Sequence, residues 1–208
     1  MKKILLILTF ALAVGMVLIT CHKEEEEEET GLLINGVVWA ASNVNRSGTF
    51  ATKPEDPGMY YQWGSNVGWS STDPLTATDG NNAWRDLSEK ENIWLPEKDP
   101  CPSGWRVPTE DELNSLTQTN YVTHIWTTEN GVSGYRLTDK TTGNSLFLPA
   151  AGIRRNSNGS LFGVGTYGLY WSSTPNDTDA CYLTFGSGNF YMYSSNRALC
   201  GSVRCVSE

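Results

Sequence analysis

The chain has 208 residues, of which 39% are hydrophobic and 11% aromatic, so it can bury a core without metal ions and disorder is excluded as its main state. Only 18% of the residues are charged, while 20 are Gly, 8 Trp and 9 Tyr, which favours a turn-rich, aromatic-anchored architecture over a helical bundle or coiled coil. The formal net charge is -8 and no basic cluster occurs outside the extreme N-terminus, so we expect no nucleic acid among the partners.

Residues 1–20 have the pattern of a secretion signal, with two lysines followed by the apolar run Ile4–Ile19. The run is too short for a transmembrane anchor, which needs about 20 apolar residues. It ends in Leu-Ile-Thr-Cys21, which resembles the lipobox of bacterial lipoproteins, although Thr20 replaces the usual Gly, Ala or Ser. The resemblance implies that Cys21 is acylated after cleavage. The alternative is a soluble exported protein that is cut nearby and keeps Cys21 as a free thiol.

Residues 21–30 form an acidic tether. The six consecutive glutamates Glu24–Glu29 repel one another, so the segment is expected to stay extended and to act as a solvated spacer. An acidic run directly after the lipid-bearing Cys also resembles the surface-export signal of Bacteroidetes lipoproteins. That resemblance implies attachment to the outer membrane, on its outer face.

Residues 31–208 are expected to form one domain, because no long linker interrupts them. Its strand-like stretches are short and are separated by Gly, Asn, Ser and Pro. In chain order, the pattern predicts strands at 36–40 and 60–63, helices at 84–93 and 110–118, and strands at 135–138, 145–148, 170–173, 181–185 and 202–206.

The helix from Glu110 to about Gln118 carries the clearest local signal. Thr109 and Glu112 form an S/T-x-x-E capping box, and Leu113 and Leu116 give an apolar pair at a helical spacing. The helix at 84–93 has a weaker pattern. Short strands, one or two helices and long irregular loops together predict the α+β class.

Six strings, taken in order, resemble the Fibrobacter succinogenes major paralogous domain, a family of exported bacterial proteins. The resemblance covers nearly all of residues 31–208 and implies a C-type-lectin-like fold of the formylglycine-generating-enzyme type. Each string alone is weak, and the combination is specific. The strings are Asn35–Ala40, Tyr60–Gly64, Pro100–Thr109, Leu146–Gly152, Tyr170–Ser173 and Ser202–Val206.

The resemblance also implies a disulfide between Cys101 and Cys205, which match the recurrent Cys pair of the family. Cys181 and Cys200 stand where the family pattern requires no Cys, so they either pair with each other or are incidental. Trp105 and Trp171 lie among β-forming residues and are interpreted as core anchors. Arg106 and Arg204 lie in apolar strand contexts, where an Arg usually pairs with a carboxylate or with backbone carbonyls.

Enzymatic chemistry finds little support in the sequence. A formylglycine-generating oxidase needs a copper-binding pair of free thiols, and only the segment 105–112 resembles that family. The chain has two histidines, His22 and His124, which give no metal cluster. Asn176, Asp177 and Asp179 are read as turn formers rather than as a calcium site. We therefore expect no enzyme activity, no cofactor and no metal ion.

The stretch from Cys181 to Ser202 is rich in Tyr, Ser, Gly and Asn, the residues that dominate antibody paratopes. Lectin-like proteins of this kind are targets of diversity-generating retroelements, which mutate adenines in template asparagine codons and cannot produce Met, Trp, Lys, Glu or Gln. Within the stretch only Met192 belongs to that excluded set. The ligand-facing candidates are therefore Cys181, Thr184, Gly186, Tyr191, Tyr193, Ser194, Ser195, Asn196, Leu199 and Cys200.

The sequence thus predicts a lipid-anchored surface protein that binds a protein, glycan or phage ligand through a C-terminal face, with tyrosines as anchors. An ordinary exposed loop has the same composition as this stretch and remains an alternative. A structural cell-envelope protein without a diversified site is a second alternative, and it requires that Tyr191 and Tyr193 are buried. An oxidase of the formylglycine-generating type is the third.

Overall fold

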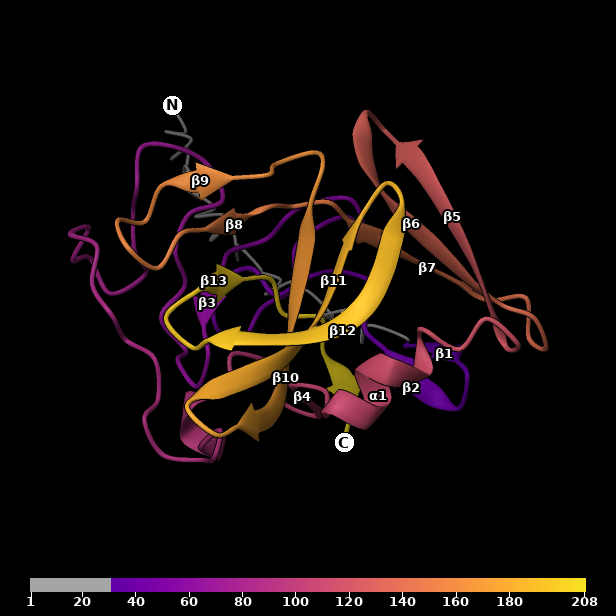
Figure 1. Cartoon of the computed structure of the whole chain (residues 1–208), viewed down its shortest axis with the longest axis horizontal. Helices are drawn as coiled ribbons and strands as arrows, with labels where there is room; N and C mark the ends of the chain where they lie inside the picture. The colour runs from indigo at the N-terminus through magenta and orange to yellow at the C-terminus, as the bar shows by residue number, and fades with distance from the viewer. Residues whose placement is uncertain (1–30) are drawn as a thin grey trace, which may run out of the picture.

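The computed structural model describes residues 31–208, which form a nearly all-β domain (Figure 1). It contains four small antiparallel sheets, the single short α-helix α1 (Glu110–Ser115) and the 3-10 turn η1 (Pro96–Lys98). The predicted α+β class and lectin-like fold are therefore wrong, because one helix of six residues is too little to form a helical layer. The signal at 1–20, the tether at 21–30 and Cys21 lie outside the described residues.

The two ends of the described chain meet in one four-stranded sheet with the order β1-β2-β14-β4. Its first hairpin turns at Asn35-Gly36, where both residues have positive φ angles of 45° and 81°, as a tight hairpin turn requires. No helix within residues 31–208 is long and apolar enough to cross a membrane. The four strands are β1 (Leu32–Ile34), β2 (Val37–Trp39), β14 (Val206–Ser207) and β4 (Trp105–Arg106).

Two three-stranded sheets contain the long strands of the domain, and each is a simple meander. In the first sheet, β5 and β6 are joined at Asn130-Gly131, again with positive φ angles. In the second sheet β11 lies between β10 and β12, so β12 is an edge strand. The six strands are β5 (Val122–Glu129), β6 (Val132–Asp139), β7 (Ser145–Pro149), β10 (Gly168–Asn176), β11 (Asp179–Gly186) and β12 (Asn189–Asn196).

The fourth sheet, of very short strands, lies beside β10, and Figure 1 shows its strands β13, β3, β8 and β9 on one side of the molecule. Its strand β13 follows the end of β12 and so fixes that end of the hairpin. The strands are β3 (Tyr61–Gln62), β13 (Cys200–Gly201), β8 (Ile153–Arg154) and β9 (Leu161–Phe162).

The β10-β11-β12 sheet separates two hydrophobic clusters. Tyr170, Leu183 and Phe185 belong to the cluster shared with α1 and the β5-β6-β7 sheet. Trp171 and Tyr182, one residue out of phase, belong to the other cluster, because successive side chains of a strand point to opposite faces. The sheet is therefore packed on both faces through most of its area.

The helix α1 confirms the capping box. The Thr109 side chain accepts a hydrogen bond from the Glu112 backbone N–H, and the Glu112 carboxylate accepts one from the Thr109 backbone N–H. The helix ends at Ser115, three residues before the predicted end. Glu112 also binds Arg106 through both guanidinium nitrogens, at 2.8 and 2.6 Å, which is the carboxylate pairing expected of that arginine.

The helix predicted at residues 84–93 does not form, and this segment is irregular. Its carbonyls at Glu89, Lys90 and Glu91 accept hydrogen bonds from the guanidinium of Arg197, more than 100 residues later in the chain. The Asp86 carboxylate binds the backbone N–H of Ser88 at 2.9 Å, which is a turn contact. Long-range and turn hydrogen bonds thus replace the helical ones.

Trp171 and Arg204 have the surroundings that the sequence predicts, and Trp105 has them only in part. Trp171 is fully buried, whereas Trp105 is only partly buried and lies at the surface of the domain. Arg204 is fully buried and donates hydrogen bonds to the carbonyls of Ala40, Ala41 and Phe147. A buried guanidinium that binds carbonyls joins segments that no strand pairing connects.

Replacing Arg204 by Met should lower the free energy of unfolding by about 3–5 kcal/mol, because several buried carbonyls would lose their donors. Urea denaturation of wild type and variant measures the difference. The exposed Arg46 provides the control, since Arg46→Met should change the free energy of unfolding by less than about 0.5 kcal/mol. Equal changes in the free energy of unfolding for the two substitutions would contradict the stabilising role of the Arg204 hydrogen bonds.

Candidate functional site

The outer face of β12 carries two tyrosines that project into solvent. Tyr191 is 48% exposed and Tyr193 is 60% exposed, and their rings meet edge to face with centroids 6.3 Å apart. On β11, Tyr182 lies opposite Tyr193 and packs against it at 6.0 Å. Tyr182 in turn packs edge to face on the buried Trp171 at 5.4 Å. A continuous row of aromatic rings therefore runs from the core to the surface.

The Tyr182 phenol lies between the core and the two exposed tyrosines. Burial raises the pKa of Tyr182 above its usual range, and the nearby hydroxyls of Tyr167, Tyr193 and Tyr191 raise it further. The hydroxyl of Tyr167 also shares a hydrogen bond with that of Tyr182. Neutral phenols present both a donor and an acceptor, so this surface can bind polar ligand groups beside flat apolar ones. We call Tyr167, Tyr182, Tyr191 and Tyr193 the tyrosine face.

The structure places the other candidate residues of the hairpin on two different sides. Ser195 lies on the same side of the sheet as Tyr191 and Tyr193. Gly186, the last residue of β11, lies on that side too. Thr184 also lies on that side, but it is buried and its hydroxyl donates to the Gly168 carbonyl at 3.0 Å. Its side chain is used inside the sheet and does not face a ligand.

The remaining candidates point elsewhere or are buried. Ser194 and Asn196 lie on the opposite side of β12, where the Ser194 hydroxyl accepts a hydrogen bond from Asn176 at 2.9 Å. Leu199 is half-buried and packs against the cluster around Trp171. Cys181 and Cys200 are buried. The candidates on the outer side of the hairpin are therefore Gly186, Tyr191, Tyr193 and Ser195, while Asn196 is exposed on the opposite side.

The sequence pattern predicts no strand between residues 185 and 202, and the structure shows that residues 189–196 form a regular strand. Their exposure alternates with a period of two over the first half of the strand, because Phe190 and Met192 pack on the core while the tyrosines point outward. The alternation is visible in the sequence and could have identified β12. The contributions of Tyr167 and Tyr182 to the face could not have been found, because they depend on strand pairing.

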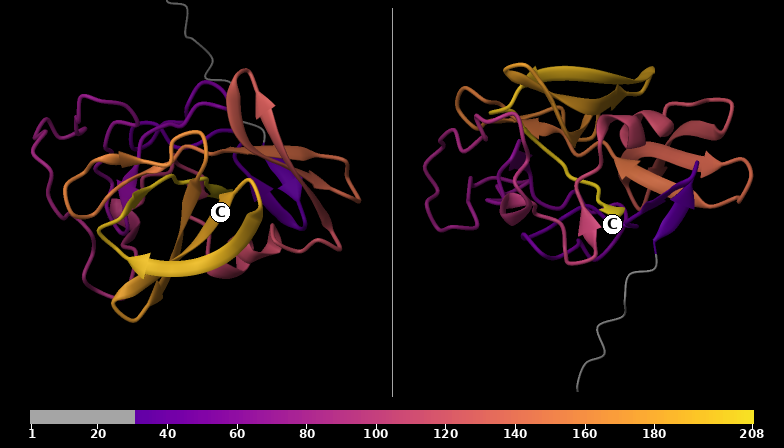
Figure 2. Two further views of the ribbon diagram at one scale, coloured as in Figure 1. Left: turned by 45° about the horizontal axis from the view of Figure 1, so that its top comes forward. Right: turned by 90° about the horizontal axis from the view of Figure 1, so that it is seen from below.

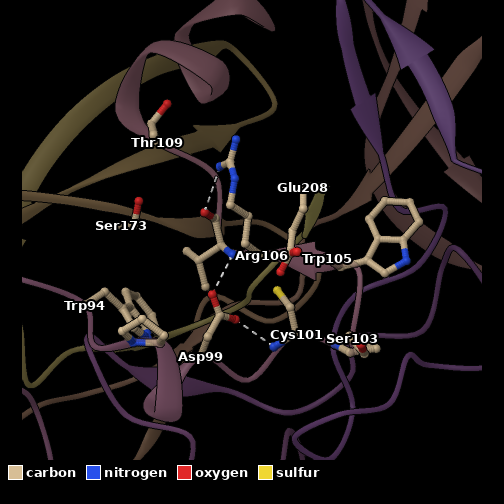
Figure 3. Close-up of a pocket in the computed structure, with 12 residues that line it drawn as sticks. Trp94, Asp99, Cys101, Ser103, Trp105, Arg106, Thr109, Ser173 and Glu208 are labelled. Atoms are coloured by element: carbon tan, nitrogen blue, oxygen red, sulfur yellow. Dashed lines mark hydrogen bonds between the residues drawn. The ribbon is translucent and has the colours of Figure 1, made fainter.

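A second surface feature is a cavity of about 620 Å³ beside the disulfide, shown in Figure 3. Trp94 and Trp105 lie on opposite sides of it in that view, with Asp99 and Cys101 between them. Asp99 accepts hydrogen bonds from the backbone N–H groups of Cys101 and Val107, at 2.8 and 3.0 Å. Burial is the main cause that raises the pKa of Asp99. This carboxylate holds the Cys101 loop in place.

Cys101 and Cys205 form a disulfide, the pairing that the resemblance implied, with an S–S distance of 2.07 Å. Cys181 and Cys200 are both free thiols. Their surroundings differ, since Cys181 lies beside Glu110 and Cys200 beside Tyr60, in another sheet. Cys181 and Cys200 therefore form no disulfide with each other, and their thiols do not form the pair that the oxidase requires.

Metal ligands do not gather in the part of the chain that the structure describes, where no three His, Cys, Asp or Glu side chains could hold an ion. Asp177 has a positive φ of 52° in the turn between β10 and β11, which is a turn-forming role. His124 lies at 2.6 Å from the Leu116 carbonyl through Nε2, and its ring packs on Phe190. Burial lowers the pKa of His124, so it is neutral at pH 7.

The structural alternative requires that Tyr191 and Tyr193 are buried, and both are exposed. Their side chains contribute little to the core beyond the contact of Tyr193 with Tyr182. A face of exposed aromatic rings on a well-packed sheet is suited to binding, because the rings lose little conformational freedom when a ligand arrives.

Both free thiols should be unreactive toward a thiol reagent in the native protein at pH 7 and fully reactive after denaturation. Burial raises the pKa of Cys181 to about 11 and that of Cys200 well above its usual value, so neither forms appreciable thiolate. Cys181→Ser and Cys200→Ser should each remove one equivalent of thiol from the denatured count. Rapid labelling of either cysteine in the native protein would contradict its burial.

Comparison with known families finds one match. Residues 126–206 are similar to a domain of unknown function, DUF8237. The match runs from β5 to β14 and so includes the hairpin that carries the tyrosine face. No curated protein and no solved structure matches the chain.

Proposed function

We propose that this chain is an exported bacterial lipoprotein, anchored in the outer membrane through Cys21 and exposed at the cell surface. Its β11-β12 hairpin binds a protein, glycan or phage ligand. The mechanism is recognition without chemistry: Tyr191 and Tyr193 act as rigid anchors, and Ser195 and Gly186 leave room and supply adaptable polar contacts. The observation that carries the proposal is the exposure of two neighbouring tyrosines on a sheet whose strands β10 and β11 are mostly buried.

The proposed cellular location of the protein rests on its first thirty residues. The signal-like run, the lipobox-like Cys21 and the acidic run after it support export, acylation and surface display. The ordered motifs at residues 35–40, 60–64 and 100–109 support membership of the major paralogous domain family, without its lectin-like fold.

Retroelement diversification belongs to the same proposal and is restricted by the hairpin geometry. Variation at Gly186, Tyr191, Tyr193 and Ser195 changes what the outer face offers to a ligand, whereas variation at buried positions changes the core. The DNA beside the gene tests this point. We expect a reverse transcriptase gene and a near-copy of the segment encoding about residues 171–204, with adenine mismatches concentrated in the codons of outer-face positions.

A near-copy whose mismatches fall mainly on Cys181 and Cys200 would contradict the assignment of the outer face. Finding neither a reverse transcriptase nor a near-copy would reject diversification and leave a binding protein of fixed specificity.

The double substitution Tyr191→Ala with Tyr193→Ala should abolish ligand binding and leave the fold intact. Exposed aromatic anchors at the centre of an interface each contribute about 2 kcal/mol or more, so the loss of both should lower the affinity by about three orders of magnitude. The measurement is binding of the purified chain to arrayed glycans and to surface proteins of phage and bacteria, followed by titration of the strongest binder.

Tyr121→Ala provides the matched control, because Tyr121 is 57% exposed but lies before β5, away from the hairpin. It should bind like the wild type. A double variant that binds normally would exclude the tyrosine face, and one that loses several kcal/mol of stability would favour the structural alternative.

A further inference from the structure

The strand β12 is an eight-residue edge strand of its sheet. All eight residues of β12 pair with β11 in one continuous register. Among residues 31–208, no strand pairs with the other side of β12. Figure 2 shows β12 as the outermost strand of its sheet, on the opposite side of the domain from β1. The backbone groups along this edge therefore have no strand partner among the described residues.

The hydrogen bonds of β10 show which strand residues point toward which neighbour. On the side of β10 away from β11, Leu169 O accepts from Ser202 N at 2.9 Å and Trp171 N donates to Ser202 O at 3.1 Å. Because the residues of a strand alternate in direction, Tyr170 bonds to β11, where it pairs with Leu183.

The same alternation continues across β11 to β12. Since Leu183 bonds to β10, its neighbour Thr184 bonds to β12, where it pairs with Tyr191. The backbone N–H and C=O groups of Phe190, Met192 and Ser194 consequently point away from the sheet. Outside the strand ladders, no backbone–backbone hydrogen bond within residues 31–208 involves these six groups.

This edge has no charged residue, no proline and no β-bulge. Natural edge strands are protected by Lys, Pro, inward-pointing charges or β-bulges. The segment Asn189–Asn196 reads Asn-Phe-Tyr-Met-Tyr-Ser-Ser-Asn, which has no charged residue and no proline. Its register with β11 has no shift, so it has no bulge. A long, uncharged and regular edge is built to accept another strand.

We propose that β12 pairs antiparallel with β12 of a second copy, about a two-fold axis at Met192. The outward residues Phe190, Met192 and Ser194 are symmetric about Met192, so all six backbone groups of each copy find partners. The strand can meet itself because it carries no charge to repel its own copy. This inference goes beyond the proposed ligand face, because it concerns the edge of the strand and not its outer side.

The two-fold pairing has a direct consequence for the tyrosines. Tyr191 of one copy lies directly opposite Tyr193 of the other, on the same side of a continuous six-stranded sheet. Cross-strand aromatic pairs of this kind stabilise a sheet. The pair presents four exposed tyrosines where one copy presents two, so two ligand sites become adjacent.

The oligomeric state of the full chain, purified in detergent, tests this inference. Sedimentation velocity over a range of protein concentrations should show a dimer for the wild type. Ser194→Pro should be monomeric, because proline removes one outward N–H donor and is tolerated where the N–H of an edge strand faces solvent. Ser194→Ala is the matched control, because it loses the hydroxyl bound by Asn176 but keeps the backbone N–H. It should remain dimeric.

If Ser194→Pro does not fold, a pair of oppositely charged double variants tests the same pairing. The variant Tyr191→Lys with Tyr193→Lys places like charges opposite each other and should be monomeric, as should Tyr191→Glu with Tyr193→Glu. An equimolar mixture of the two should form a heterodimer. A wild type that stays monomeric at all concentrations, or a mixture that does not associate, would overturn the inference. A monomeric wild type would leave the ligand-binding proposal intact, since that proposal needs one copy only.

Discussion

The domain depends on the burial of both faces of β10. Tyr170 points to one side and donates a hydrogen bond from its hydroxyl to the Pro149 carbonyl at 2.8 Å. Trp171 points to the other side and donates from Nε1 to the Tyr61 carbonyl at 2.9 Å. On the edge of β10 away from β11, the Ser202 N–H donates to the Leu169 carbonyl and the Ser202 carbonyl accepts from the Trp171 N–H. With both faces and both edges occupied, β10 cannot shift its register, because a slip of one residue would exchange Tyr170 and Trp171 between two cores.

The proposed site follows from this fixed base. β11 pairs with β10, and among the described strands β12 pairs with β11 alone, so the sheet ends in a strand with one packed side, one open side and one edge without a strand partner. Tyr191 and Tyr193 occupy the open side and rest on Tyr182, which rests on Trp171. A ligand that binds there meets rings whose positions are already determined by the core, which lowers the entropic cost of binding. The open edge is where a second copy can extend the sheet.

Local signals predicted some elements and failed at others for identifiable reasons. The capping box at Thr109 and Glu112 predicted α1, because its hydrogen bonds lie within four residues of chain. The pattern at 84–93 failed because turn contacts within the segment and hydrogen bonds from Arg197, far along the chain, hold it in an irregular conformation. The α+β class failed with it, since the class required a helical layer. The alternation that marks β12 was present in the sequence but was outweighed by its loop-like composition.

The sequence by itself determined the capped helix, the positions of several short strands and the paratope-like composition of the C-terminal stretch. Only the tertiary structure decided that Tyr191 and Tyr193 face solvent while Thr184 and Cys181 are buried. It also decided that the hairpin ends in an unpaired edge. The physical reason is that a strand residue is exposed or buried according to what packs on its face, and the packing partners of β12 come from distant segments.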